Sequence, residues 1–370
     1  MKVSAAVLRR PSAEFDIERL DLEDPRPDEV LVELVATGVC HTDISCQNQT
    51  IPTQLPVVLG HEGAGVVLAV GDEVRDVAPG DHVLLSYGWC GRCRPCSQAA
   101  AAYCVDSASL NLSGNRPDGS SSFGDGVRSH FFGQSAFASH AVVPECNVVV
   151  VPREVPLALM APLGCGVQTG AGAVLNALKV PSGASLVVFG AGAVGLSAVM
   201  AARLAGADPI IAVDLVPGRL QLARDLGATH VVDARTQDPM RVIAQVTGGT
   251  PDFTLEAAGT ATTFRQALSC LGRRGVCGLV GAAGPAVTPE FDWAHVLMNG
   301  ITVRGIIQGD STPRDFLPEL IGLFLTGRFP VDRLVTTYPF ARINRAVRDA
   351  HEGTAVKPVL LMSDEGTVDV

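Results

Sequence analysis

The chain lacks an excess of positive charge. Its 370 residues include 28 lysines and arginines against 38 aspartates and glutamates, which gives a net charge of −10. Nucleic acids and anionic membrane surfaces attract basic patches, so neither is expected as the main partner. A hydrophobic fraction of 47% is ordinary for a globular protein with a large core. At roughly 150 residues per domain, this length predicts two or three domains.

Segments that would direct the chain to or through a membrane are also lacking. The N-terminal stretch MKVSAAVLRR has too short an apolar run for a signal peptide. The uncharged stretch between Lys179 and Arg203 is long enough to span a membrane. It contains Pro181 and several glycines, however, and is more typical of a buried strand, a turn and a buried helix. We therefore expect a cytoplasmic protein without a membrane partner.

The pattern of apolar residues changes along the chain. Short runs such as EVLVELVATG, GAGVVLAV and NVVVVP predict a mainly antiparallel β domain up to about residue 150. From about residue 167, apolar strands alternate with helices, which predicts a parallel sheet covered on both faces. Near the end, FLPELIGLFLTG predicts an amphipathic helix, and VKPVLLM predicts a strand that rejoins the first domain.

A glycine-rich turn lies in VVFGAGAVG, where Gly190, Gly192 and Gly195 follow an apolar strand and open a helix. Asp214 ends the next strand, as the dinucleotide-binding fingerprint requires. The glycines would allow a tight turn, close approach of a pyrophosphate, and packing of helix on strand. The Asp214 carboxylate would bind ribose hydroxyls and repel a 2′-phosphate, which favours NAD over NADP. A turn used only for packing is the alternative.

Ten cysteines in a chain without a secretion signal favour metal binding or catalysis over disulfides. Four of them lie close together in CGRCRPCSQAAAAYC, at Cys90, Cys93, Cys96 and Cys104. Two C-x-x-C spacings and a fourth thiol predict a closed structural zinc site. Four thiolates could instead hold an iron–sulfur cluster. A zinc-ribbon lobe could also bind nucleic acid, but only Arg92 and Arg94 are basic nearby.

A second set of metal-binding residue types is scattered. Cys40 follows a predicted strand, His61 and Glu62 lie in the turn GHEGAG, and Cys165 lies in PLGCGVQTG. Two thiolates and an imidazole are the ligand set of a catalytic zinc with an open fourth position. No short spacing links these residues, so their composition alone does not establish that they meet.

Taken together, these motifs resemble zinc-dependent medium-chain alcohol dehydrogenases, in particular the aryl-alcohol (benzyl-alcohol) dehydrogenase branch. GVCHTD, GHEGAG, the four-cysteine lobe, PLGCGVQTG, GAGAVG and Asp214 occur in that family's order and span nearly the whole chain. The resemblance implies an α/β protein with a GroES-like, mainly-β catalytic domain at 1–166 and 303–370. It places the structural zinc lobe at about 86–106 and a Rossmann domain, a doubly wound parallel sheet, at 167–302.

The resemblance also implies cofactors, partners and metal ligands. It implies two zinc ions per chain, one catalytic and one structural, together with NAD, a small-molecule alcohol or aldehyde substrate, and a homodimer or homotetramer. Cys40, His61 and Cys165 would bind the catalytic zinc. Asp43 would orient His61, and Glu62 would lie behind the metal.

Further residues are implied at the dinucleotide. They are His41, Thr169, Gly190, Gly192, Ala193, Val194, Gly195, Asp214, Arg219, Val280 and Lys357. Within this set we expect Thr169 in the nicotinamide pocket, Arg219 near the adenosine ribose, and His41 and Lys357 near the pyrophosphate. Ordinary solvated positions are the alternative for the basic residues.

The family's proton path is altered in this sequence. Thr42 would hydrogen-bond the reacting oxygen, and relatives often carry a histidine three residues further on, where this chain has Ser45. A serine is not a base near neutral pH, so we expect water to complete the path. Cys46 is expected to be a bystander.

Two segments are similar to the aryl-alcohol branch, namely GIIQGDSTPRDFLPELI and SHFFGQSAFA. The implied pocket residues are Ser86, Phe131, Phe132 and Ile306; plain core packing is the alternative for the phenylalanines. Ser86 stands where small-alcohol enzymes often have a phenylalanine, which would leave room for a larger substrate.

The predicted reaction is hydride transfer between NAD and an aromatic or allylic primary alcohol of the benzyl, geranyl or perillyl type, giving the aldehyde. One alternative is oxidation of an S-(hydroxymethyl)thiol formed from formaldehyde. A more remote alternative is a non-catalytic protein that binds zinc and NAD.

Overall fold

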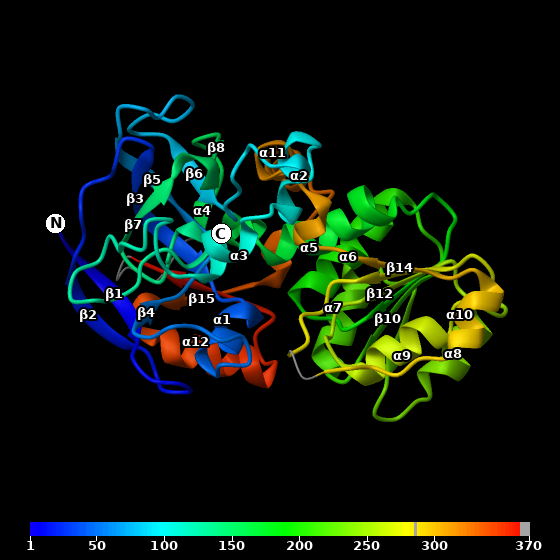
Figure 1. The fold of residues 1–370 in the computed structure, drawn as a ribbon. Helices are drawn as coiled ribbons and strands as arrows, with labels where there is room; N and C mark the ends of the chain where they lie inside the picture. The colour runs from blue at the N-terminus through cyan, green and yellow to red at the C-terminus, as the bar shows by residue number, and fades with distance from the viewer. Residues whose placement is uncertain (285–286, 363–370) are drawn as a thin grey trace. The chain divides into compact units, whose positions relative to one another are not determined.

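The computed structural model describes residues 1–284 and 287–362, which form two compact units (Figure 1). The first unit comprises Met1–Cys165, Thr312–Leu323 and the chain from Val331 onward, and the second comprises Gly166–Ser311 and Phe324–Pro330. The sequence predicts that the chain re-enters the first domain at residue 303, but this residue lies inside a strand of the second unit. The end of the expected domain, residues 363–370, lies outside the described residues.

The first unit is built on a seven-stranded sheet in which all neighbours but one pair are antiparallel. Its strands are β3 (Glu29–Gly38), β5 (Gly63–Val70), β6 (His82–Leu85), β7 (His140–Pro144), β8 (Val148–Val151), β15 (Val335–Pro339) and β16 (Lys357–Leu361). A smaller sheet contains β1 (Lys2–Leu8), β2 (Asp16–Asp21) and β4 (Val57–Val58). The predicted C-terminal strand is confirmed, because β16 pairs with β3 through Val359 and Gly38.

Short helices complete the first unit. They are α1 (His41–Gln47), α2 (Arg94–Ser97), α3 (Ser107–Leu112), α4 (Leu157–Met160) and α12 (Ile343–Glu352). The predicted amphipathic helix is α11 (Pro313–Leu325), whose apolar side chains Phe316, Leu317 and Leu320 are buried. Buried apolar residues of β3 and β5 form one core together with residues of β6, β7 and β8.

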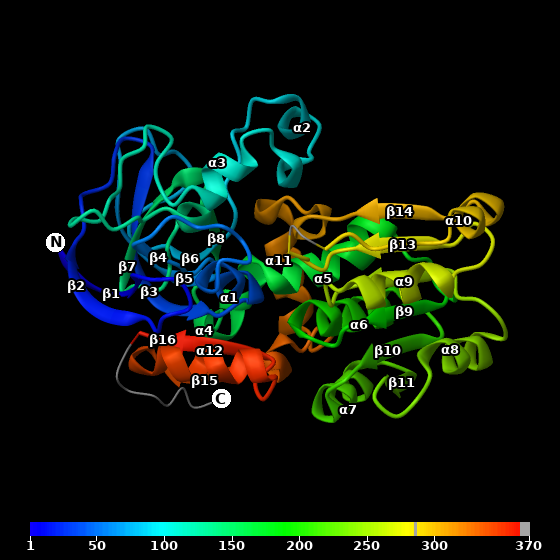
Figure 2. The same cartoon turned by 60° about the horizontal axis from the view of Figure 1, so that its bottom comes forward.

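The second unit is a doubly wound α/β domain with a six-stranded parallel sheet (Figure 2). Its strands are β9 (Leu186–Phe189), β10 (Ile210–Asp214), β11 (His230–Asp233), β12 (Phe253–Glu256), β13 (Val276–Leu279) and β14 (Thr302–Gly305). The strand order β11-β10-β9-β12-β13-β14 is that of the Rossmann fold. Because β14 pairs with β13, the second unit extends beyond the expected boundary; β14 is short and exposed, and its sequence TVRG carries a weak strand signal.

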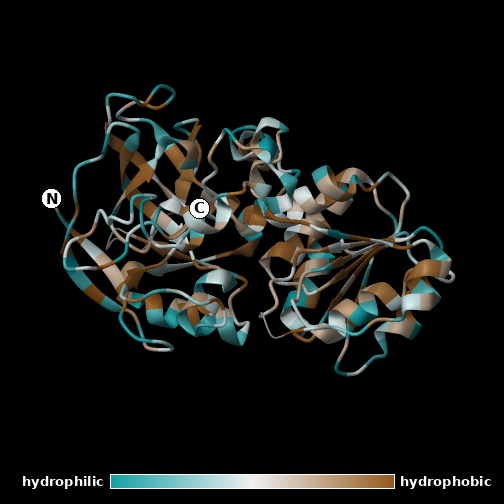
Figure 3. Ribbon diagram, viewed as in Figure 1, coloured by the Kyte–Doolittle hydropathy of each residue, from teal (hydrophilic) through white to brown (hydrophobic). Residues whose placement is uncertain are grey.

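Helices flank this sheet. They are α5 (Gly166–Gly172), α6 (Ala193–Ala205), α7 (Pro217–Leu226), α8 (Pro239–Thr247), α9 (Ala261–Ser269) and α10 (Trp293–Asn299). Figure 3 shows hydrophobic strands at the centre of the unit and helices with mixed faces around them, as expected for a parallel sheet that is buried on both sides.

Within residues 1–284 and 287–362, no single helix is both long and apolar enough to cross a membrane. Two helices, at 157–164 and 166–178, pass that test by length and composition only when taken together.

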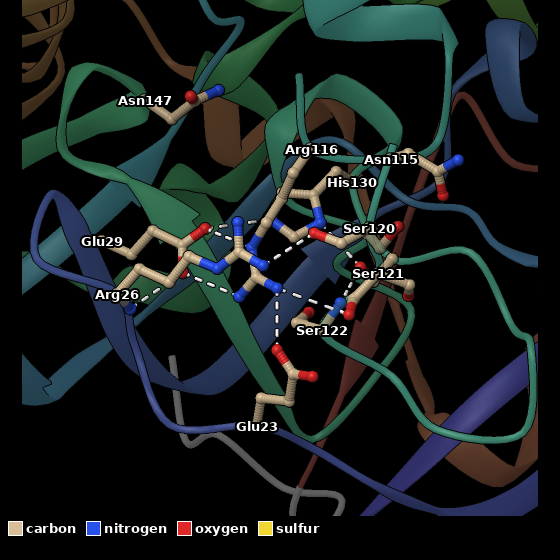
Figure 4. Close-up of polar contacts among 12 residues, drawn as sticks. Glu23, Arg26, Glu29, Asn115, Arg116, Ser120, Ser121, Ser122, His130 and Asn147 are labelled. Carbon is tan, nitrogen blue, oxygen red and sulfur yellow. Dashed lines mark hydrogen bonds and ion pairs between the residues drawn. The ribbon is translucent and has the colours of Figure 1, made fainter. Parts of the chain in front are cut away.

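A buried ion pair ties the long segment before β7 to the start of β3 (Figure 4). The Arg116 guanidinium is 4% exposed and donates to both carboxylate oxygens of Glu29, at 2.6 and 2.8 Å. It also donates to the exposed Glu23, and His130 Nε2 lies 3.6 Å from Glu29. Burial raises the pKa of Glu29, but the nearby His130 ring and the hydrogen bonds from Arg116 outweigh it and lower the pKa to about 2. The pair therefore stays ionised at neutral pH.

Replacing Glu29 should destabilise the first unit far more than replacing Glu23. Glu29→Gln leaves a buried guanidinium uncompensated, which costs about 3–5 kcal/mol, whereas Glu23→Gln removes an exposed partner worth about 1 kcal/mol or less. Urea unfolding at pH 7 measures both. The folded-state pKa of Glu29 is depressed, so its contribution is present above pH 4.5 and is lost as the pH falls toward 2. Equal losses for the two variants would contradict this account.

Candidate metal centres and dinucleotide-binding turn

The scattered cysteines and histidine meet in the first unit. Cys40 follows β3, His61 and Glu62 precede β5, and Cys165 follows a short helical turn. One ligand atom from each of the four residues lies within 4.8 Å of those of the other three. The antiparallel pairing of β3 with β5 brings two of these chain segments together, because the Gly38 N–H donates to the Glu62 carbonyl at 3.0 Å.

Asp43 fixes the orientation of the His61 ring. Its Oδ1 lies 2.9 Å from His61 Nδ1 and accepts from the Gly60 N–H, while its other oxygen accepts from the Cys40 N–H at 2.8 Å. In the described part of the chain, the buried Nε2 of His61 has no hydrogen-bond partner. An imidazole held through Nδ1 with Nε2 facing two thiols is a suitable donor set for zinc.

Protonation in this cluster follows from burial and proximity. Hydrogen bonding from Cys165, opposed by burial, holds the pKa of the Cys40 thiol well below its usual range. Burial lowers the pKa of His61, but the Asp43 carboxylate raises it well above the ordinary value. A metal ion would therefore compete with a proton for Nε2 and would bind a ready-formed thiolate.

Glu62 has a partner that sequence reasoning did not identify. Lys357 was expected beside a pyrophosphate, but it is the first residue of the fully buried strand β16 and is 2% exposed. Its ammonium lies 2.8 and 3.0 Å from the two Glu62 carboxylate oxygens and donates to the Val39 carbonyl. Burial lowers the pKa of Lys357, but the Glu62 carboxylate raises it above the usual value, so Lys357 is charged. Burial outweighs the attraction of Lys357 at Glu62 and raises the pKa of that carboxyl.

The other residues of helix α1 that the sequence singled out differ in how far they are exposed to solvent. The Thr42 hydroxyl lies 3.8 Å from the Cys40 sulfur, and Ser45 is buried at 6% exposure. His41 is exposed. Cys46 is fully buried among apolar side chains, and burial raises its pKa to about 12, which suits the bystander role expected from the sequence.

Two phenylalanines pack against His61. The Phe132 ring is stacked on the imidazole, with ring centroids 4.5 Å apart and an interplanar angle of 26°. Phe131 meets the same ring edge-on at 5.5 Å, but it is fully buried in a core cluster. Ser86 is also fully buried, and its hydroxyl donates to the Gly164 carbonyl at 2.7 Å. Ile306 belongs to the second unit, where its side chain lies near Gly278.

The four-cysteine lobe also brings its thiols together. The Sγ atoms of Cys90, Cys93, Cys96 and Cys104 all lie within 4.8 Å of one another. The Cys93 sulfur lies 3.3 Å from that of Cys96 and 3.9 Å from that of Cys104, close to the ~3.8 Å that tetrahedral bonds of about 2.3 Å to zinc require. Backbone hydrogen bonds, from Val105 above all, lower the pKa of Cys93 to about 6, which favours the thiolate.

The glycine turn of the second unit joins β9 to α6. Gly190 has a φ of +97°, and a Cβ atom at Gly195 would collide with the Gly190 carbonyl. By contrast, a Cβ atom at Gly192 would meet no other atom within 4 Å. The turn thus needs the first and third glycines for its own shape and leaves open space beside the second. Ala193 and Val194 begin α6 there, where helix N–H groups are free to bind phosphate.

Asp214 ends β10 beside this turn. Its carboxylate accepts from the N–H groups of Ala191, Leu215 and Val216, at 2.6 to 2.8 Å. A carboxylate has about four acceptor sites, so these bonds leave capacity for a ribose hydroxyl. The turn and the acid therefore fit a dinucleotide. Nearby, Arg219 is half-buried on α7, and its Nε has no partner in the part of the chain that the structure describes.

Two further positions expected at the cofactor lie in the second unit. Thr169 is on α5 and its hydroxyl lies 3.4 Å from the side chain of Gln308. Val280 follows β13 and donates its N–H to the carbonyl of Glu256 at the end of β12. Sequence reasoning missed two buried amides of the first unit, Gln134 and Asn147, because single amides belong to no motif.

Comparisons with known proteins agree with this architecture. Residues 26–153 match the alcohol dehydrogenase GroES-like domain, and residues 193–325 match the zinc-binding dehydrogenase family. Geraniol dehydrogenase from Castellaniella defragrans is 40% identical over 366 residues, covering 98% of both chains.

Two solved structures are also similar over the full length. An alcohol dehydrogenase zinc-binding domain protein from Burkholderia ambifaria is 50% identical, with a TM-score of 0.96 over 98% of this chain and 99% of that one. Benzyl alcohol dehydrogenase from Acinetobacter calcoaceticus is 45% identical, also with a TM-score of 0.96, over 98% of this chain and 100% of that one. The chain therefore belongs to the zinc-dependent medium-chain alcohol dehydrogenase family, and is an alcohol dehydrogenase that uses zinc and NAD(P).

Proposed function

We propose that this enzyme oxidises aromatic and allylic primary alcohols to aldehydes with NAD. The observation that carries the proposal is the Phe132 ring stacked on His61, 4.5 Å from the imidazole of the candidate metal cluster. An aromatic side chain there offers a flat apolar surface to a ring or an alkene next to the reacting carbon. Relatives named for geraniol and benzyl alcohol, both of this substrate class, support the same conclusion.

The chain's own residues would prepare the reaction as follows. Cys40, His61 and Cys165 would hold zinc, which when bound lowers the pKa of an alcohol hydroxyl, while the nicotinamide accepts hydride. Asp43 keeps the His61 ring oriented through Nδ1. The Thr42 hydroxyl, near Cys40, would hydrogen-bond the alcohol oxygen and take its proton only while releasing its own hydroxyl proton to the next acceptor. Because Ser45 is buried and is not a base, water would complete the transfer.

Initial rates with NAD should fall in a defined order. Benzyl, cinnamyl, perillyl and geranyl alcohols should each give a kcat/KM at least about tenfold above that of ethanol, because an apolar pocket gains affinity from each buried carbon. Formaldehyde with an added thiol is the matched comparison. Faster turnover with formaldehyde and thiol would favour the S-(hydroxymethyl)thiol alternative. An NADH fluorescence change on mixing, without turnover of any of these alcohols, would favour a non-catalytic protein that binds zinc and NAD.

We further propose that each chain holds two zinc ions with separate functions. The purified protein should contain two equivalents by elemental analysis. Cys40→Ser should lose one equivalent and its turnover while retaining its thermal stability. Cys96→Ser should lose the other and its stability, because a closed thiolate site contributes folding energy. Visible absorption typical of iron–sulfur clusters, or one equivalent in the unaltered protein, would contradict the assignment.

The preference for NAD is proposed to rest on the Asp214 charge. Asp214→Gly should raise the ratio of kcat/KM with NADP to that with NAD by roughly two orders of magnitude, because like charges placed together cost several kcal/mol. Asp214→Asn is the matched control, since it removes the charge and keeps an acceptor oxygen for the turn. Equal use of NADP by the unaltered enzyme would rule the proposal out.

We also propose that the enzyme is a homo-oligomer, a dimer or tetramer, formed through the edge of the second unit's sheet. Among the described strands β14 is at the edge, and all four of its residues are exposed. On α10, Trp293, Leu297 and Met298 are 74%, 66% and 79% exposed. An uncovered strand edge beside large apolar side chains is an association surface in soluble proteins. A monomeric mass by light scattering would refute this.

A further inference from the structure

Two buried amide side chains link the segments around His61 in the first unit. Gln134 and Asn147 are each 1% exposed, and both donate to the Ser86 carbonyl, at 3.2 and 2.7 Å. Ser86 directly follows β6, and Asn147 directly precedes β8. The two amides therefore bind the same carbonyl, that of Ser86, at the end of the β6–β8 pairing.

Asn147 holds Ser86 and Phe132 together. Its main-chain carbonyl accepts from the Ser86 N–H at 2.9 Å. Its side-chain Nδ2 bridges two carbonyls, those of Ser86 and of Phe132, the latter at 2.9 Å. Both are positions that the sequence placed in the substrate pocket. One side chain thus sets the separation between two expected pocket segments.

Gln134 connects the Ser86 carbonyl to the candidate metal cluster. Its Nε2 also donates to the His61 carbonyl at 3.0 Å, and its Oε1 accepts from the Gly63 N–H at 3.1 Å. The main chain of His61 is thereby tied to that of Ser86. Since a buried carbonyl without a hydrogen bond is strongly unfavourable, each of these bonds favours a single arrangement of the two segments.

Phe132 has a backbone conformation that needs such support. Its φ of 52° lies in the left-handed region, which is unfavourable for an L-residue, and Gly133 follows with a φ of 68°. A Cβ atom at Gly133 would lie 2.7 Å from the Asn147 amide, so the turn packs directly on that side chain. The stacked position of the Phe132 ring depends on this turn.

Space is available for the turn to relax. A cavity of about 240 Å³ is bordered by Gly133 and Asn147 together with Trp89, Arg116 and His130. Figure 4 shows Asn147 at a distance from the ion pair around Arg116, which anchors the segment leading into the turn. Without the Asn147 contact, the turn could move toward this cavity, and the phenyl ring would leave the imidazole.

We propose that Asn147, supported by Gln134, is a positioning residue for substrate selectivity. It holds Phe132 over His61 and so maintains the surface that receives the ring or alkene of the substrate. The inference rests on the proposed function, because it assumes that Phe132 contacts the alcohol. Asn147 itself acts only through Phe132, whose main chain it ties to that of Ser86.

The test compares benzyl alcohol with ethanol in Asn147→Ser and Asn147→Asp. Neither replacement can donate to both carbonyls, and Asp keeps the size of the side chain. We expect kcat/KM for benzyl alcohol to fall about tenfold, mainly through KM, while the value for ethanol changes little. Zinc content should stay at the level of the unaltered enzyme in both variants. A ratio that stays constant in a folded variant would overturn the proposal.

Asn111→Ser is the matched control. Asn111 is also a buried amide, 3% exposed, and it binds the N–H and carbonyl of Gly88, two residues from Ser86. Its further side-chain hydrogen bonds in the described part of the chain go to Ser107, and none goes to the Phe132 carbonyl. This replacement should lower thermal stability but leave the benzyl alcohol to ethanol ratio unchanged. An equal change of ratio in Asn111→Ser would show a general loosening and would count against Asn147.

A double-mutant cycle with Phe132→Leu separates the two residues' effects. If Asn147 acts through Phe132, adding Asn147→Ser to Phe132→Leu should change the ratio no further. Additive effects would overturn the proposal. Failure of the proposed function is distinguishable, because an unaltered enzyme that does not prefer benzyl alcohol over ethanol reveals it before any variant is made.

Discussion

The antiparallel pairing of β3 with β5 is the interaction on which the candidate metal cluster depends. It places Cys40, at the end of one strand, beside His61 and Glu62, at the start of the other. The approach is so close that a side chain at Gly38 would collide with the Glu62 carboxylate. Cys165 reaches the same point because the Gly164 carbonyl is bound by the Ser86 hydroxyl at the end of β6. Three neighbouring strands, β3, β5 and β6, thus bring the four residues of the cluster together.

Several buried charged side chains surround this cluster, and each of those named below has a partner of opposite charge or a hydrogen-bond donor. Glu62 and Lys357 form one buried ion pair, while Asp43 accepts from two main-chain N–H groups and contacts the His61 ring. A metal ion would add positive charge beside the Cys40 thiol, whose pKa lies well below its usual range because Cys165 hydrogen-bonds to it. Such an arrangement is costly to bury unless every charge has a partner, which the structure provides.

Much of the fold could be predicted from the sequence. Apolar periodicity and the glycine turn before Asp214 identify the second unit, because a strand, a turn and a helix follow one another locally. The strand β14 was harder to recognise: it is short, lies at the edge, and has no buried face to produce a pattern. The return to the first unit was therefore expected too early.

The candidate site was predictable only in part. Local spacing identified the four-cysteine lobe, and the family resemblance grouped Cys40, His61 and Cys165, whose meeting is visible in the structure. Sequence alone gave no sign that Lys357 would pair with Glu62, because the contact joins residues 295 positions apart. The same holds for the amides of Gln134 and Asn147, whose roles depend on main-chain groups that carry no sequence signal.

The two thiol clusters also differ in how far apart in the sequence their residues and supporting charges lie. Cys90 to Cys104 are close neighbours in sequence, so closing that loop costs little entropy and the lobe can bind metal during synthesis, soon after Cys104 is made. The other cluster needs Cys165, and its Glu62 lacks its counter-charge until Lys357 in the last strand has been synthesised and paired with β3. If both clusters bind the proposed zinc ions, the second cluster therefore gains its buried counter-charge later than the lobe gains its four thiols.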